Sequence, residues 1–309
     1  MYGSFCLYER MIKISSVSPL IFDVESTGFE HSIDYVQKFE REDTPILIQI
    51  VDVPNKTFSM LLVDLYNGTS YPISPQKYVI NDYNTLYEFT INPSNDGTYQ
   101  AKITNEAGEI SVSLPFCLHS ASYTAFTMQI EYTNANNQQA FGAVFDVSGN
   151  KRVFKTRVEG GFKSDSRQLA VENEQFRTQK QEPINLYSVP YEKRTLTIGD
   201  NEGVPFEIAR LLNNIFCLSS VKINGVSYTR SESSIPEQQT IAERYPQFNY
   251  TLAVECSKNV SYNGFTEYPD GSGIVGEVSL NVSNAKDGQV LVFKGNKGSF
   301  VNQSHLDSL

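Results

Sequence analysis

The sequence predicts a mostly β protein that carries one packed helix. Short runs rich in valine, isoleucine, threonine, tyrosine and phenylalanine recur along the chain, separated by the turn residues glycine, asparagine, aspartate and proline. A helical spacing of apolar residues appears near residues 203–217. With 309 residues, 40% of them hydrophobic, the chain is long enough for two ordinary domains or three small ones.

The N-terminus and the overall charge narrow the class of protein. In MYGSFCLYERMIKIS the charged Glu9, Arg10 and Lys13 stand where a cleaved signal peptide needs its apolar stretch, and no apolar run approaches the roughly 18 residues that span a bilayer. We therefore expect no membrane partner and treat residues 1–19 as an N-terminal extension, with Met11 as a second possible start. The net charge of −10 argues against nucleic acid as a partner, because phosphate-backbone binding draws its energy from lysine and arginine clusters.

Cysteine and histidine usage points to neither a metal centre nor a disulfide scaffold. The chain has four cysteines and three histidines, and no two cysteines form a C-x-x-C pair. The sequence thus predicts free thiols, no metal and no cofactor. The cysteines are Cys6, Cys117, Cys217 and Cys256.

Residues 20–118 are expected to form the first β domain, with strand-like runs at 45–53, 57–65 and 109–114. The most specific segment is SNDGTYQAKITNEAGEISVSL, residues 94–114. Here a strand with one apolar face leads through a turn at 105–108 into a return strand with one apolar face. The apolar positions are Tyr99, Ala101 and Ile103 on the first strand, and Ile110, Val112 and Leu114 on the second.

This hairpin resembles the F–G hairpin of immunoglobulin-like sandwiches, where D-x-G-x-Y-x-C marks a tyrosine corner. Asp96 and Tyr99 match the corner with a spacing one residue tighter, and Ala101 stands where the cysteine would be. The resemblance implies an Ig-like β-sandwich without its inter-sheet disulfide, in which Tyr99 is buried with its hydroxyl bonded to backbone. It implies no particular function, because such sandwiches host many activities.

Residues 119–256 are expected to form a β-rich domain that carries the helix. In DNEGVPFEIARLLNNIFCL, Asp200 or Asn201 is placed to cap the helix, and Pro205 is tolerated in its first turn. The hairpin VKINGVSYTR follows, with an Asn224-Gly225 turn, and the glycine- and proline-containing segments 157–166 and 186–200 before the helix are rich in turn residues. One face of the helix is apolar and comprises Val204, Ile208, Leu211, Leu212, Ile215 and Phe216.

Candidate catalytic residues do not form a recognisable set, so we expect no enzyme. The three histidines, His31, His119 and His305, lie far apart, although His119 follows Cys117 by two residues, in what the pattern suggests is a connection between domains. The glycines of Glu159-Gly160-Gly161 favour a turn or bulge over a phosphate loop, because no Lys-Ser/Thr pair follows. Glu232 and Glu237 could pair for glycoside hydrolysis, but a solvated loop after the hairpin is the simpler interpretation.

The C-terminal segment, residues 257–309, contains a hairpin pattern in NAKDGQVLVFKGNKGSFVNQ, residues 284–303. An isolated two-stranded hairpin is marginal in water. One way to cover such a hairpin is for residues 274–301 to fold back and complete the preceding β domain.

Two stretches resemble phage tail proteins. The blocks VEGGFK, LYSVPYEKRTLTIGDNEGVPFEIARLLNNIF and VKINGVSYTRSESSIPE, in this order, are similar to tail-associated proteins of tailed phages and prophages, the crAss-like phages of gut bacteria among them. The segment GEVSLNVSNAKDGQVLVFKGNKGSFVN looks like a small unit of phage tail fibres, with Phe293 in place of its tyrosine and Phe300 in place of its tryptophan. In such fibres the hairpin units bury their apolar edges against copies from neighbouring chains, so this resemblance implies that Leu291, Phe293 and Phe300 are half-exposed in a monomer and covered in an assembly, instead of being covered by a fold-back of residues 274–301. The candidate interface residues that this second resemblance implies are Asp287, Gly288, Leu291, Phe293, Phe300 and Val301.

These resemblances imply a non-enzymatic structural protein of a phage tail virion, assembled in the host cytoplasm. It would be an adaptor or hub that associates with itself and with other tail proteins and contacts a fibre. The alternative is a bacterial surface binding module that presents Ig-like loops to a glycan or a protein.

Overall fold

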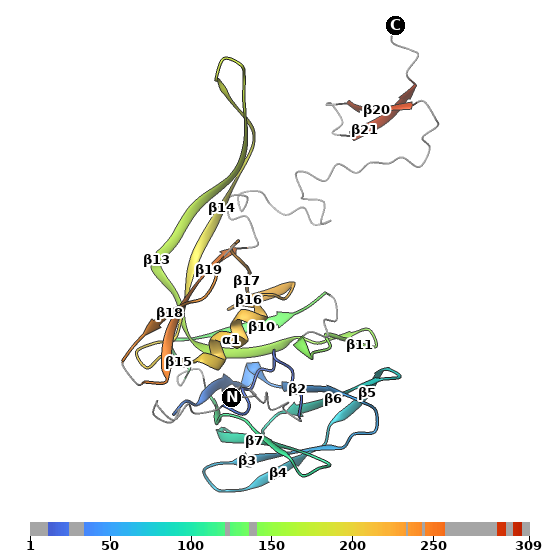
Figure 1. Cartoon of the computed structure of the whole chain (residues 1–309), viewed down its shortest axis with the longest axis vertical. Coiled ribbons are helices and arrows are strands. Elements are labelled where there is room, and N and C mark those ends of the chain that lie inside the picture. The colour runs from blue at the N-terminus through green and yellow to red at the C-terminus, as the bar shows by residue number, and fades with distance from the viewer. Residues whose placement is uncertain are drawn as a thin grey trace, which may run out of the picture. The chain divides into compact units, whose positions relative to one another are not determined.

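The structure is a computed structural model, and it describes residues 12–24, 34–120, 124–135, 141–232, 234–242, 245–256, 289–294 and 299–304. The chain divides into two compact units, Met1–Ser261 and Tyr262–Leu309. As the sequence predicts, the fold is mostly β (Figure 1), and the described residues include one α-helix. The first unit holds two β modules, a sandwich and a barrel.

The sandwich has the strand order of an immunoglobulin-like domain. One sheet has the order β2-β6-β5 and the other β1-β9-β7-β3-β4, which correspond to the B-E-D and A′-G-F-C-C′ sheets of that fold. In the longer sheet β1 and β9, which correspond to strands A′ and G, pair in parallel. The neighbouring strands β2-β6-β5 of the one sheet and β9-β7-β3-β4 of the other pair antiparallel. The strands are β1 (Gln37–Glu40), β2 (Ile46–Asp52), β3 (Phe58–Asp64), β4 (Ser70–Ile73), β5 (Gln76–Asn81), β6 (Asn84–Ile91), β7 (Gly97–Asn105), β8 (Ile110–Val112), which pairs with β7, and β9 (Phe116–His119).

The core of the sandwich contains the three residues of the first hairpin strand that the sequence motif placed there, Tyr99, Ala101 and Ile103. Tyr99 is buried, and its hydroxyl donates a hydrogen bond of 2.9 Å to the carbonyl of Asn95, which is the contact of a tyrosine corner. Burial raises the pKa of the Tyr99 hydroxyl. Ala101 is fully buried, and Asp96 lies outside the core, where it pairs with Arg41 at 2.8 Å.

The Tyr99→Phe variant should lose about 1–2 kcal/mol of the free energy of unfolding, because it removes the hydrogen bond that the buried Tyr99 side chain donates to the carbonyl of Asn95. Urea unfolding followed by circular dichroism measures the change. Tyr66→Phe is the matched control, since the Tyr66 side chain is 96% exposed and should lose nothing measurable. Equal stability of the two variants would argue against a structural role for the corner.

The return strand of the hairpin differs from the expected pattern. Ile110 is 62% exposed, and the buried positions are Ser111 and Ser113. The Ser113 hydroxyl accepts a hydrogen bond from the backbone N–H of Ala101, and Ser111 donates to the carboxylate of Asp23. Polar side chains are tolerated on this buried face because each finds a hydrogen-bond partner.

The second module is a closed antiparallel barrel. Its strands pair in the order β14-β13-β10-β16-β17-β19, and β19 pairs back with β14 to close the ring. The turn between β16 and β17 is the predicted Asn224-Gly225, both residues having positive φ. The strands are β10 (Thr127–Thr133), β13 (Phe154–Arg177), β14 (Pro183–Ile198), β16 (Ser220–Ile223), β17 (Val226–Arg230) and β19 (Gln247–Cys256), with β15 (Val204–Pro205) and β18 (Glu237–Thr240) on β19, and β11 (Asp146–Val147) pairing with β12 (Asn150–Lys151).

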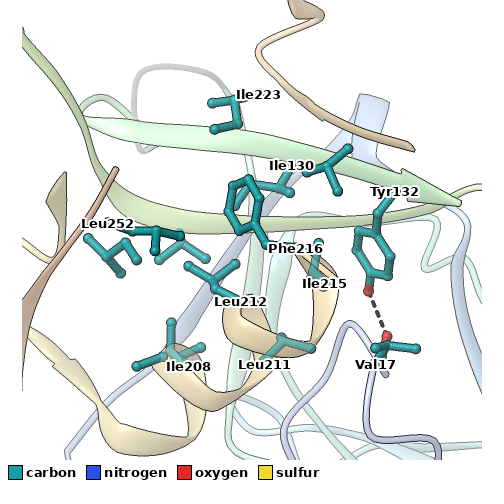
Figure 2. Packing of buried hydrophobic residues seen from close by; sticks show 14 of the residues in the cluster. Val17, Ile130, Tyr132, Ile208, Leu211, Leu212, Ile215, Phe216, Ile223 and Leu252 are labelled. Carbon is teal, nitrogen blue, oxygen red and sulfur yellow. Dashed lines mark hydrogen bonds between the residues drawn. The ribbon is translucent and has the colours of Figure 1, made fainter. Parts of the chain in front are cut away.

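Helix α1 (Phe206–Ile215) packs its predicted apolar face into the barrel core. Figure 2 shows Leu212 and Phe216 between the helix and the strands that carry Ile130 and Leu252. The helix begins later than predicted, because Val204 and Pro205 form a short strand on β19, and neither Asp200 nor Asn201 caps it. The carbonyl of Val17 accepts a hydrogen bond from the Tyr132 hydroxyl at 2.8 Å in the same core.

The segment 12–24 belongs to the folded unit, although residues up to 19 were expected to be an extension. Val17 and Ile21 are buried in the barrel core, and Leu20 and Phe22 in the sandwich core. Because neighbouring residues of this segment enter different cores, it connects the two modules. The expected boundary near residue 118 falls at the end of β9, so Cys117 and His119 lie in a strand of the sandwich rather than in a connection.

The C-terminal unit contains the predicted hairpin. Strands β20 (Gln289–Lys294) and β21 (Ser299–Ser304) pair antiparallel in a two-stranded sheet of their own, with Phe293 opposite Phe300. Leu291 and Val301 also lie in these strands, and Asp287 and Gly288 lie outside the described residues.

Candidate functional site

The candidate catalytic groups that the structure describes have environments that do not favour catalysis. His31 and His305 lie outside the described residues. Cys117 is buried, and burial raises the pKa of its thiol, which disfavours the thiolate that a nucleophile requires. Over the described ranges, no group of three or more histidine, cysteine, aspartate or glutamate side chains is placed to hold a metal ion.

The two carboxylates considered for glycoside hydrolysis are both exposed. Glu232 lies in the loop after β17, and Glu237 begins β18. The predicted solvated loop is therefore confirmed for Glu232. It is wrong for Glu237, which is the first residue of strand β18.

The Glu159-Gly160-Gly161 segment lies inside strand β13 and is structural. Gly160 has a φ of 124°, and a Cβ there would meet the carbonyl oxygen of Thr197 at 2.2 Å. Only glycine fits such a close approach of two backbones. The segment begins where the pairing of β13 with β10 ends, at Glu159.

Glu159 is buried and joins the barrel to the sandwich. Its carboxylate accepts a hydrogen bond of 2.6 Å from the Tyr35 hydroxyl and pairs with Lys38 at 2.9 Å. Burial raises the pKa of Tyr35 well above its ordinary value, and the charge of Glu159 adds to the rise. Burial acts to lower the pKa of Lys38, but the hydrogen bond to Glu159 and the charge of Glu159, together with smaller contributions from Asp200 and Cys117, outweigh it, so the pKa is raised.

A second buried charge pair crosses the same boundary. The Arg157 Nε of β13 lies 2.8 Å from the carboxylate of Asp43, and the Asp43 side chain is fully buried. Glu40 pairs with the same guanidinium at 3.1 Å, and the exposed Glu42 at 3.4 Å. The Asp43 carboxylate also accepts the backbone N–H of Glu40 at 2.7 Å, so its lone pairs are used.

A third set of contacts lies where β2 and β6 meet the barrel. The carboxylate of buried Glu88 accepts a hydrogen bond of 2.7 Å from Gln49 Nε2 and pairs with the Arg152 guanidinium at 3.0 Å. The hydrogen bond from Arg152 to Glu88 raises the pKa of Arg152. Gln49 in turn bonds both backbone groups of Val144. We name the three sets, centred on Glu159, Arg157 and Glu88, the polar seam. Because its charges are paired and hydrogen-bonded, the polar seam is suited to holding two modules together rather than to catalysis.

A long two-stranded ribbon extends from the barrel. Strand β13 has 24 residues and β14 has 16, well beyond the roughly 3–10 residues usual for a strand. Among the described strands, β13 pairs with β10 up to Glu159 and β14 pairs with β19 from Lys193, so beyond these barrel ends the two strands pair with each other alone. We call residues 163–192 the ribbon. Figure 1 shows it extending away from the rest of the first unit.

Apolar side chains on the ribbon are open to water. Leu169 is 91% exposed, the highest value among the large aliphatic residues described. A two-stranded ribbon is marginally stable alone, and apolar side chains gathered on an exposed element mark an interaction surface. Further exposed apolar residues of the ribbon, among the side chains that the structure describes, are Val171, Phe176, Ile184 and Leu186.

Sequence reasoning missed this ribbon, because it took 157–166 and 186–200 as turn-rich segments. The structure corrects that reading, since both are extended strands over most of their length.

The comparisons add no relative. Comparison of the chain with protein-family models, curated proteins and solved structures finds no match. Within the part of the chain that the structure describes, there is no helix of the length and apolarity needed to cross a membrane.

Proposed function

We propose that this protein is a non-enzymatic structural component of a phage tail, an adaptor or hub that assembles with other tail proteins and contacts a fibre. The observation that carries the proposal is the ribbon, which offers exposed apolar side chains on an arm fixed to a closed barrel. An arm of this kind suits binding between chains better than chemistry on a small molecule. The two resemblances to phage tail proteins support the choice of a tail.

The polar seam also favours an assembly role. It joins the sandwich and the barrel through buried charge pairs, so a force on one module is passed to the other. A hub protein needs such rigid coupling, because its binding surfaces must keep fixed directions.

The direct test is imaging of particles from cultures of the source strain, with a gold-labelled antibody against this chain. Label at the tail of negatively stained particles is the expected result. Label on the bacterial surface, with none on particles, would contradict the proposal. Particles from a strain that lacks the coding sequence are the control for specificity of the antibody.

Deletion of residues 262–309 should leave the first unit folded, with an almost unchanged melting temperature, because the chain divides at this point. The same deletion should remove binding to a tail-fibre protein of the particle, as followed by co-purification. The physical reason is that each apolar side chain covered in an interface contributes roughly 1.5–3 kcal/mol relative to exposure. A truncated chain that still binds the fibre protein would move the contact elsewhere, and one that unfolds would show that the hairpin stabilises the first unit.

The alternative, a surface module that binds a glycan or protein, has one observation in its favour. A pocket of about 290 Å³ lies at the edge of the sandwich, and the exposed Tyr71, Asn92 and Asn95 are among the residues that line it. An aromatic face next to amide groups is a usual composition for a small-ligand site. Glycan-array binding that is lost in Tyr71→Ala would favour this function over the tail protein.

A further inference from the structure

The two edges of the ribbon differ in their capacity to accept another strand. Strand β14 carries Pro183 and Pro190, which lie opposite Arg177 and Val171 of β13. A proline fits an antiparallel ladder where its nitrogen faces away from the partner strand. The outer edge of β14 therefore lacks a donor at both positions, and prolines placed in this way block the addition of a strand.

The outer edge of β13 keeps all its donors. Hydrogen-bonding directions alternate along an antiparallel strand, so Val171, opposite Pro190, directs its N–H and C=O outward, as do Arg167, Leu169 and Asn173. None of these residues is proline. Among the described strands, β13 pairs with β10 and β14 alone, and the pairing with β10 ends at Glu159. This edge thus presents unpaired backbone groups along the ribbon.

Side chains along this edge are arranged symmetrically about Ala170. Leu169 and Val171 flank it and are 91% and 55% exposed. The next positions outward, Gln168 and Glu172, are both polar, and so are Arg167 and Asn173 beyond them. A sequence that reads alike in both directions is what an antiparallel pairing of two identical strands requires.

We propose that a second copy of this chain pairs with the ribbon, β13 against β13, antiparallel about a two-fold axis at Ala170. In this register Leu169 lies opposite Val171 of the second copy, and the four apolar side chains gather on one face. Gln168 lies opposite Glu172 of the second copy, and Arg167 opposite Asn173, so no like charges face each other. Residues with outward backbone groups oppose one another, as hydrogen bonding between the two strands demands.

The symmetry selects a second copy over a strand of another protein. A strand of another protein would only need apolar residues that pack against Leu169 and Val171. Pairing with such a strand would not require the order of apolar and polar residues to be the same on both sides of Ala170. The product is a four-stranded sheet with the proline-bearing β14 strands at both outer edges, so the pairing closes at two copies. This proposal concerns the purified chain and does not depend on membership of a phage tail.

The test begins with the mass of the full-length chain by analytical ultracentrifugation over a range of concentrations. The wild type should form a dimer, and Leu169→Lys should raise its dissociation constant on the order of tenfold or more, because two apolar contacts are lost by symmetry. Leu186→Lys on β14 is the matched control, exposed on the same ribbon, and should dimerise as the wild type does. Melting temperatures of both variants check that they fold.

A cysteine at the axis tests the register. Ala170→Cys places two thiols directly opposite each other in a non-hydrogen-bonded pair, where the Cβ atoms of facing residues come closest, about 4.5 Å apart, and it should give a reducible covalent dimer under mild oxidation. Ser188→Cys on β14 should not, and the wild type controls for its native thiols. A monomeric wild type, a dimer indifferent to Leu169→Lys, or equal cross-linking of the two cysteine variants would each overturn the proposal.

Discussion

The Arg157→Met variant is expected to lose about 3–5 kcal/mol of the free energy of unfolding, because it leaves the carboxylate of Asp43 buried without its cation. Methionine fills a similar length of space, so the loss reports on charge more than on packing. The remaining partners of Asp43, such as the backbone N–H of Glu40, do not neutralise it. Urea unfolding followed by circular dichroism measures the loss.

A neighbouring ion pair supplies the control for Arg157. Lys155 lies on the same strand and pairs with Glu131 at 3.7 Å, but both side chains are more than 20% exposed. Lys155→Met should therefore cost less than about 1 kcal/mol. Replacing both members of the buried pair, as Arg157→Met with Asp43→Asn, should recover part of the loss, because no uncompensated charge stays buried. A double variant as unstable as Arg157→Met alone would assign the cost to packing.

The sandwich could be predicted from the sequence because its information is local. The segments expected at 45–53 and 57–65 became β2 and β3, and the Tyr99 corner lies within a few residues of the carbonyl that it binds. The helix was predicted for the same reason, since a 3.6-residue period is visible in one stretch of chain. Its start was placed too early because Val204 fits the helical pattern and is buried in a strand instead.

The polar seam could not be predicted, because its partners are distant in the sequence. Nothing in the local sequence distinguishes Asp43 or Arg157 from other charged residues of the chain. They become partners only when the two modules pack together. The ribbon was missed for a different reason. Pro183, Pro190 and the glycines at 160 and 161 are turn residues in most contexts, and only an edge strand or a close backbone approach makes them compatible with long strands.

The Leu212→Ala variant is expected to lose about 2–5 kcal/mol of the free energy of unfolding, the cost of a large-to-small change in a packed core. Leu212 is 1% exposed and lies in the cluster that α1 shares with the barrel strands (Figure 2). The barrel encloses that cluster on the other sides, so the structure can collapse onto the vacated space only in part. Thermal and urea unfolding of the full chain measure the loss.

The same substitution at Leu169 is the matched control for Leu212, and comparing them separates core from interface. Leu169 is 91% exposed, so Leu169→Ala should change the stability of the monomer by less than about 0.5 kcal/mol. The two variants should then affect different quantities. Leu212→Ala should lower the free energy of unfolding, and Leu169→Ala should weaken association of copies without lowering the free energy of unfolding. A stable Leu212→Ala chain would mean that α1 is not part of the core, and the helix face would become a second surface for binding between chains.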